Sequence, residues 1–206
     1  MLRGWVAGSV LAAVALLGAV WLIAALTGSG GPTSLHRPPF VVGDRLDVVR
    51  ILGRNALVLA LHAMACVAGF IAGSSLPLQA KQRTGLTRLI HERGGRLAML
   101  FVLGATTFSL SAQAYVLGLS VAHVAGALHV SPGLLLLRLL PHAIPELTAL
   151  FLPLAAWIIA SRKGDWDELL AATLVTVLIA VPVLVTAALW EVYVAPHVLH
   201  ALIGYS

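Results

Sequence analysis

The chain has 206 residues, of which 60% are hydrophobic and only 10% are charged, and its formal net charge is +5. Soluble domains carry about a quarter charged residues, so this composition excludes an ordinary soluble protein and indicates an integral membrane protein. The positive charge does not predict nucleic-acid binding, because the cations fall in short segments between apolar runs, where the positive-inside rule places them. A lipid bilayer is therefore the expected surrounding, and no nucleic acid is expected as a partner.

Five apolar segments are candidates for membrane spans. The first begins behind Arg3 and is longer than the apolar core of a signal peptide, so we expect an uncleaved first span. The fourth has only 15 residues, so it either begins earlier, in Leu134–Leu140, or is re-entrant. We predict an all-α helical bundle in a single membrane domain, residues 1–206, with a broken or re-entrant segment around Pro141–Glu146. The expected spans are residues 5–26, 55–71, 97–128, 146–160 and 169–195.

The connections between these spans indicate how the chain is oriented. Residues 28–54 begin as a Gly/Pro-rich loop and continue as GDRLDVVRILGR, whose alternation of apolar and charged residues predicts a short amphipathic helix at the membrane interface. With the N-terminus inside, the inner segments carry eight Lys and Arg residues and the outer segments carry five. This bias predicts a cytoplasmic N-terminus and an outer C-terminus.

Few polar side chains lie within or at the edge of the apolar segments, and an ionisable group at membrane depth costs enough free energy to need a reason. For each of them a packing role competes with a functional one. An Asn suits a helix N-cap, and a His or Gln can hydrogen-bond between helices. Glu191 is either an interfacial carboxylate beside aromatic anchors or a second acid that faces the bundle and meets the expected break. The set comprises Asn55, His62, Gln113, His123, His142, Glu146 and Glu191.

Residues 139–151, LLPHAIPELTALF, hold the most informative pair. His142 and Glu146 are four residues apart and would share one face of a continuous helix. Pro145, however, lacks a backbone donor and disfavours a helical conformation before it, so it suits the first turn of a new helix. We therefore predict that the helix breaks here, with His142 in the connector and Glu146 in the first turn after it. Such breaks occur at membrane depth where the backbone is buried in protein or faces a watery cavity.

A polar cleft at this break would suit several kinds of chemistry. His142, Glu146 and Glu191 could relay protons, polarise a water molecule, or ligate zinc as a trio. Imidazole and carboxylate groups both bind zinc, although no HExxH motif is present, and no other cofactor is expected. The alternative is that Glu146 is only a partly hydrated helix-start residue near the headgroups. Cys66 is the single cysteine, so it can form no intramolecular disulfide.

The ordered set of these motifs resembles the stage II sporulation protein M family of membrane proteins. The family pattern begins with an Asn at the head of a span, here RNALVLALHAMACVAGF with Asn55, and a later span carries a polar pair before a Gly, here QAYVLG with Gln113. Its centre is His-Gly, two residues and Glu, here PHAIPELTA with His142 and Glu146. It ends with a Glu that precedes a Pro, here WEVYVAP with Glu191.

The resemblance covers about Asn55–Pro196, and it departs from the pattern at two positions. Ala143 stands where the family has Gly, which limits how tightly the backbone can turn, and Gln113 replaces an Asn. The resemblance implies a multi-pass protein of the bacterial plasma membrane. Founding members of the family scaffold peptidoglycan-remodelling enzymes during sporulation. Relatives occur beside transport ATPases, or in gene sets for circular bacteriocins, where they assist maturation, secretion or immunity. The implied partners are therefore membrane or peptide partners, such as a transport ATPase or a cell-wall enzyme.

Three functions remain open on the sequence alone. The leading hypothesis is a membrane component that scaffolds, or helps export or process, a peptide or envelope substrate through a cleft at His142, Glu146 and Glu191. The second is a membrane-embedded peptide maturase for leader cleavage or head-to-tail joining, with Glu146 or Glu191 as general base and His142 as proton carrier. The third is a proton-coupled transporter that uses the same acids. The sequence leaves open whether the protein is an enzyme and whether it forms a homo-oligomer.

Overall fold

The computed structural model describes residues 2–28, 44–81 and 84–198, and there the chain forms helices joined by short turns. Five segments are helical, long and apolar enough to cross a membrane, which confirms the predicted all-α membrane bundle. Residues 29–43 of the predicted loop and the tail after residue 198 lie outside the described residues. The five segments are Leu2–Thr27, Arg45–Ser75, Leu97–Ala127, Pro132–Lys163 and Trp166–Val198.

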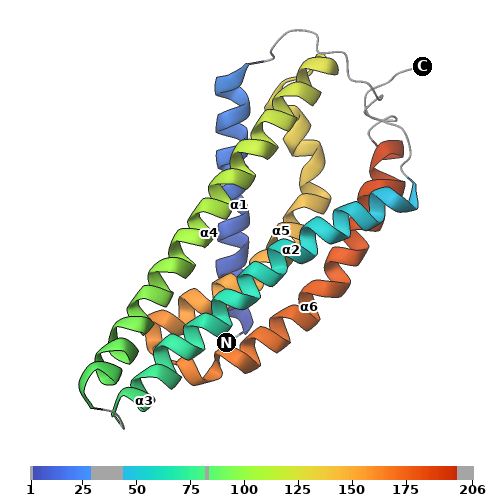
Figure 1. Ribbon diagram of the computed structural model, residues 1–206. Helices are drawn as coiled ribbons and strands as arrows, with labels where there is room; N and C mark the ends of the chain where they lie inside the picture. Colours follow the sequence, from blue (N-terminus) through green and yellow to red (C-terminus); the bar gives the residue numbers. More distant parts are fainter. Residues whose placement is uncertain (1, 29–43, 82–83, 199–206) are drawn as a thin grey trace.

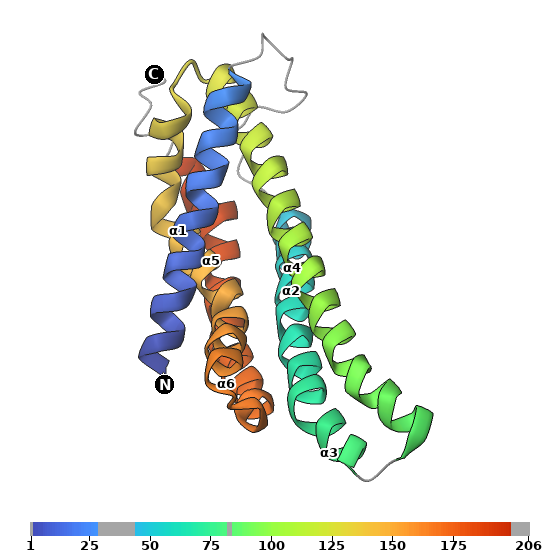
Figure 2. The same cartoon turned by 90° about the vertical axis from the view of Figure 1, so that its left-hand side faces the viewer.

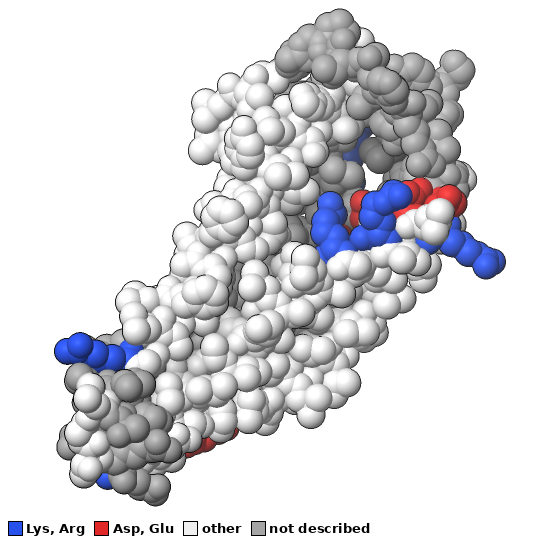
Figure 3. Space-filling model, viewed as in Figure 1, with Lys and Arg blue, Asp and Glu red and all other residues white. Residues whose placement is uncertain are grey.

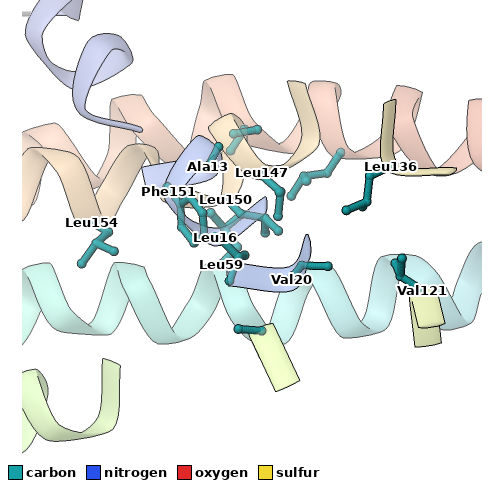
Figure 4. Close-up of a cluster of buried hydrophobic side chains, with 14 of the residues drawn as sticks. Ala13, Leu16, Val20, Leu59, Val121, Leu136, Leu147, Leu150, Phe151 and Leu154 are labelled. Carbon is teal, nitrogen blue, oxygen red and sulfur yellow. The ribbon is translucent and has the colours of Figure 1, made fainter. Parts of the chain in front are cut away.

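The helices pack around α5 (Pro132–Lys163), which lies at the centre of the bundle. α1 (Leu2–Thr27) packs against α5 and α4 (Gly85–Ala127), while α2 (Arg45–Phe70) packs against α5 and α6 (Leu169–Leu189). The second half of α5 is the most deeply buried part of the chain's described helices. Figure 4 shows apolar side chains from α1, α2, α4 and α5 that meet in this core. The core therefore fixes α5 relative to the other helices.

The described part of the connection from α2 to α4 is helical up to Lys81. α2 continues into a π-helical segment, η1 (Ile71–Ser75), and then into α3 (Leu76–Lys81), which packs against the start of α4. α4 has 43 residues and begins at Gly85, well before the predicted third span. Figure 1 shows that α2 and α4 lie close together near α3 and diverge toward their other ends. This divergence creates the space in which the candidate site lies.

The predicted interfacial helix is not a separate element, because its residues form the first turns of α2. Asp44 caps this helix: its carboxylate accepts a hydrogen bond from the backbone N–H of Asp47 at 3.1 Å, and the Asp47 carboxylate accepts one from the Asp44 N–H at 3.2 Å. No proline follows, so the helix runs without interruption from Arg45 into the second span. The proposed N-cap role of Asn55 is therefore wrong, since Asn55 lies inside α2.

The predicted break around Pro141–Glu146 is also wrong, because α5 is one continuous helix that contains Pro141, Pro145 and Pro153. Each proline removes one backbone donor and bends the helix, and Figures 1 and 2 show that α5 changes direction along its length. Pro141 and Pro145 are exposed on the outside of the bundle, so their rings do not disturb the packed face. Packing against neighbouring helices lets a membrane helix keep such prolines. His142 therefore lies one turn before Glu146 in the same helix.

One glycine allows α1 and α4 to approach each other closely. A Cβ atom added to Gly118 would lie 2.6 Å from Cγ2 of Ile23 and 3.2 Å from the carbonyl oxygen of Val20. These distances are shorter than van der Waals contacts, so any side chain at residue 118 would push the two helices apart. Gly118 therefore lets α4 pack directly against α1.

Candidate functional site: a lateral cavity with a polar corner

The divergence of α2 and α4 leaves a cavity of about 1150 Å³, lined by α1, α2, α4, α5 and the chain after α6. Most of its lining is apolar. Leu57 of α2 and Phe108 and Val116 of α4 line the cavity and are also 74%, 76% and 59% exposed. In a bilayer these side chains contact lipid, so the cavity opens sideways toward the hydrocarbon. Figure 3 shows this hollow beside the charged start of α2.

Polar side chains of three helical segments line the cavity on the side of α2 and α5. α2 contributes three of them, the middle of α5 contributes two, and one comes from η3 (Trp190–Val194), a π-helical turn that continues α6. We call this group the polar corner. It consists of Asp47, Arg54, Asn55, His142, Glu146 and Glu191.

A direct hydrogen bond joins two helices at the polar corner. Nδ2 of Asn55 in α2 donates to Oε1 of Glu146 in α5 over 2.5 Å. Both residues are buried, with 3% and 9% of their surfaces exposed. A buried carboxylate without a partner is costly, so the amide of Asn55 stabilises Glu146 at this depth. The bond explains why an Asn occupies the interior of α2.

Glu191 brings a second carboxylate to the same place. It lies in η3, and a π-helical turn shifts the register of the helix that carries it, a feature often found at functional sites. Glu191 is close enough to Glu146 and to Arg54 to interact electrostatically with both. Glu146 likewise interacts with Arg54. The positive charge of Arg54 thus acts on both carboxylates, and the structure brings together the two acids that the sequence singled out, although without a break in the helix.

The third member of the predicted zinc trio, His142, is half-buried and lines the same cavity. Within the described residues, however, no group of three or more His, Cys, Asp and Glu side chains converges closely enough to hold a metal ion. His142, Glu146 and Glu191 therefore do not form the ligand set that a zinc site requires. Instead, the polar corner offers hydrogen-bond acceptors for a cation or an N–H donor, and titratable groups that can exchange protons with an occupant of the cavity.

The remaining polar residues singled out in the sequence take other places. His62 is fully buried in α2, and its Nδ1 donates to the carbonyl oxygen of Leu150 in α5 over 2.8 Å, which is the interhelical hydrogen bond expected of a packing histidine. Gln113 lines the cavity from α4 and donates to Oγ of Ser109 in its own helix, so this bond does not join two helices. His123 is exposed on α4 and does not line the cavity.

Sequence reasoning missed Asp47 and Arg54, which it assigned to an interfacial segment. In the continuous helix α2 the two residues are seven positions apart, or about two turns, so they lie on the same face. Arg54 also directly precedes Asn55 and lies near enough to the two carboxylates for its charge to act on both. The signal that could have revealed this arrangement is the capping box at Asp44 and Asp47, which starts the helix early.

The fold and the site define the class: a multi-pass helical membrane protein with a laterally open, mainly apolar cavity and acidic residues in one corner. A family model described as Stage II sporulation protein M matches residues 95–196. We therefore assign the chain to the SpoIIM-like family. The matched segment contains Gln113, His142, Glu146 and Glu191, whereas Asn55, which holds Glu146, lies before it. No curated protein and no solved structure gives a significant match.

Proposed function

We propose that this protein is a membrane component of a cell-envelope assembly and that it holds part of a membrane-embedded substrate in its cavity. The observation that carries this proposal is the cavity itself, which is apolar, open sideways and acidic in one corner. A substrate that resides in the bilayer can enter between α2 and α4 without crossing a polar surface. Its polar part can then exchange hydrogen bonds with Glu146 and Glu191.

The side chains around the cavity favour binding over nucleophilic catalysis. A nucleophilic hydroxyl group needs a hydrogen-bonded base. Of the two serines that line the cavity, Ser109 accepts a hydrogen bond from Gln113, and Ser120 donates to the carbonyl oxygen of Val116. Both lie on α4, whereas the carboxylates come from α5 and η3. A scaffolding or export role needs only a cavity that binds its substrate, and it does not need an activated nucleophile.

A peptide maturase is the second candidate, and one observation favours it. Two carboxylates and a histidine line the same cavity, which is the kind of group that general acid and base chemistry uses. In that case Glu146 or Glu191 would activate the attacking group and His142 would carry the proton. The two candidates differ in what a neutral amide at residue 146 should do. A scaffold that holds its substrate through the negative charge of Glu146 should lose assembly, whereas a maturase should lose only proton transfer.

We also place the N-terminus in the cytoplasm. The distribution of Lys and Arg supports this orientation. The start of α2 and the end of α6 then face outward, and the polar corner lies closer to the outer surface than to the inner one. This position suits a substrate on its way to the cell wall.

The test measures assembly and processing separately in the native host. Glu146→Gln keeps an oxygen acceptor for Asn55 but removes the charge, and Ala112→Phe fills the cavity from α4. Ala127→Phe is the matched control, since Ala127 is exposed on the same helix and does not line the cavity. We expect the first two variants to lose co-purification of envelope partners and the control to retain it. Assembly that survives both substitutions contradicts the scaffold, and processing that stops while assembly survives favours the maturase.

A further inference from the structure

The size of the cavity restricts what can occupy it, if the proposed function is correct. Its lining on α4 runs from Ala105 to Val124, which corresponds to a length of about 28 Å at 1.5 Å per residue. The volume of about 1150 Å³ is therefore spread along most of the thickness of the hydrocarbon core rather than gathered in a rounded pocket. An elongated occupant that lies along α4 fits this shape.

An extended peptide is also elongated, but it does not fit the chemistry of the lining. Every residue of such a peptide, however, presents an N–H and a C=O group that must find partners away from water. The lining is mostly apolar, and the charged residues among its described members all lie in the polar corner. Acyl chains are elongated as well, and they carry no group that needs a hydrogen-bond partner.

The charges of the polar corner indicate the headgroup. The polar corner carries the formal negative charges of Asp47, Glu146 and Glu191 against the positive charge of Arg54, and Asp47 is paired with Arg50 over 2.8 Å. Glu146 and Glu191 therefore outnumber Arg54 by one formal negative charge. An anionic headgroup would meet two carboxylates, and basic pockets rather than acidic ones bind such lipids. A quaternary ammonium has no N–H donor and is usually held by an aromatic cage, whereas Phe108 is the only aromatic side chain in the lining within the described part of the chain. A primary ammonium supplies both the charge and three N–H donors.

We propose that the cavity binds a phospholipid whose headgroup carries a primary ammonium. The ammonium lies between Glu146 and Glu191, the phosphate lies toward Arg54, and the acyl chains follow α4 between Ala105 and Val124. The inference rests on the proposed function, because it names the chemical class of the membrane-embedded substrate. It also assigns the sideways opening between α2 and α4 as the entry route from the bilayer.

Native mass spectrometry of the detergent-purified protein tests this directly. The protein is titrated with an equimolar mixture of phosphatidylethanolamine, phosphatidylcholine and phosphatidylglycerol that share the same acyl chains. We expect the ethanolamine lipid to bind about tenfold more tightly than either competitor, which is the equivalent of one charge-assisted hydrogen bond. Equal binding of the three lipids, or preferential binding of phosphatidylglycerol, would overturn the proposal.

Four variants locate the binding site. Glu191→Gln should reduce the preference for ethanolamine over choline to about twofold or less, because it removes one of the charged acceptors. Arg54→Gln should weaken the binding of all three lipids, because each carries a phosphate. Arg45 is exposed on the same helix and does not line the cavity, so Arg45→Gln should leave lipid binding unchanged. Ala112→Phe should lower binding of every lipid at least fivefold. Unchanged binding in both Glu191→Gln and Ala112→Phe would place the lipid elsewhere and refute the site.

The lipid inference and the proposed function fail in different ways. If the headgroup preference is absent but Ala112→Phe still abolishes assembly of the envelope complex, the lipid inference is wrong and the scaffold stands. If the preference is present but assembly does not depend on residue 112, the proposed function is wrong and the lipid site stands. Retention of a hydrophobic peptide in the cavity, with no lipid bound, would also overturn the lipid inference.

Discussion

The hydrogen bond from Asn55 to Glu146 ties α2 to α5 at the polar corner, and its removal has a predictable cost. Asn55→Ala removes the donor while the carboxyl group of Glu146 stays buried. A hydrogen bond to a charged group contributes about 1.5–3 kcal/mol, which agrees with the cost of about 1–3 kcal/mol for leaving a buried acceptor without a partner. We expect the substitution to lower the free energy of unfolding by about 2–3 kcal/mol, which corresponds to a fall in Tm of about 4–12 °C for a protein of this size.

A double-mutant cycle isolates this bond from the other effects of the substitution. Combining Asn55→Ala with Glu146→Leu removes both partners, so we expect the pair to show a coupling energy of about 1–3 kcal/mol. Cys66→Ala is the matched control: Cys66 is also buried in α2, but its Sγ donates to the carbonyl oxygen of Pro153 over 3.1 Å. The effects of Cys66→Ala and Glu146→Leu should therefore add within about 0.5 kcal/mol.

Reversible unfolding of each variant in detergent micelles, followed by circular dichroism, supplies these free energies. Glu146→Gln should cost less than Glu146→Leu, because its amide oxygen still accepts the hydrogen bond from Asn55. A coupling energy below about 0.5 kcal/mol for residues 55 and 146, no larger than that of the control pair, would refute the role of this bond.

Three further predictions concern packing and orientation. Gly118→Ala should lower the free energy of unfolding by about 1–3 kcal/mol, because the new Cβ would meet Ile23 of α1 at 2.6 Å; an unchanged Tm contradicts that close approach. Gly104→Ala, in the same helix with nothing within 4 Å of its Cβ position, should instead raise stability by about 0.5–1 kcal/mol, and a loss in the same melting experiment contradicts the open space there. The only native cysteine is buried, so single cysteines introduced in place of Arg45 or Lys163 report the orientation of the chain. In intact cells an impermeant maleimide should label residue 45 but not residue 163. The reverse labelling pattern would overturn the cytoplasmic N-terminus.

The membrane class and the five spans could be read from the sequence because they depend only on the length and hydropathy of each segment. Rare acids in apolar segments usually face the interior of a bundle, which is why Glu146 and Glu191 could be expected to meet. The hydrogen bond from Asn55 to Glu146 could not be predicted in this way. It joins residues 91 positions apart, and it depends on how α2 and α5 are rotated against each other. Periodicity alone does not determine that rotation.

The continuous α5 shows where a local rule gives the wrong answer. Pro145 is unfavourable in the middle of an isolated helix, so the sequence predicted a break before Glu146. In the bundle, Pro141 and Pro145 face outward while the opposite face of α5 packs against α1 and α2. Tertiary contacts on the packed face stabilise the bent helix and offset the free-energy cost of the prolines. A local sequence pattern holds no information about these contacts. The same contacts place His142 and Glu146 on one side of the cavity.

The central claim is that the space between α2 and α4 is a binding site rather than a gap in the packing. The most direct measurement is a density map of the protein extracted together with its native membrane. We predict elongated density along α4 between Ala105 and Val124, with a polar end within hydrogen-bond distance of Glu146 or Glu191. A cavity closed by its own side chains, or filled by a helix that leaves both carboxylates without a contact, would contradict the claim.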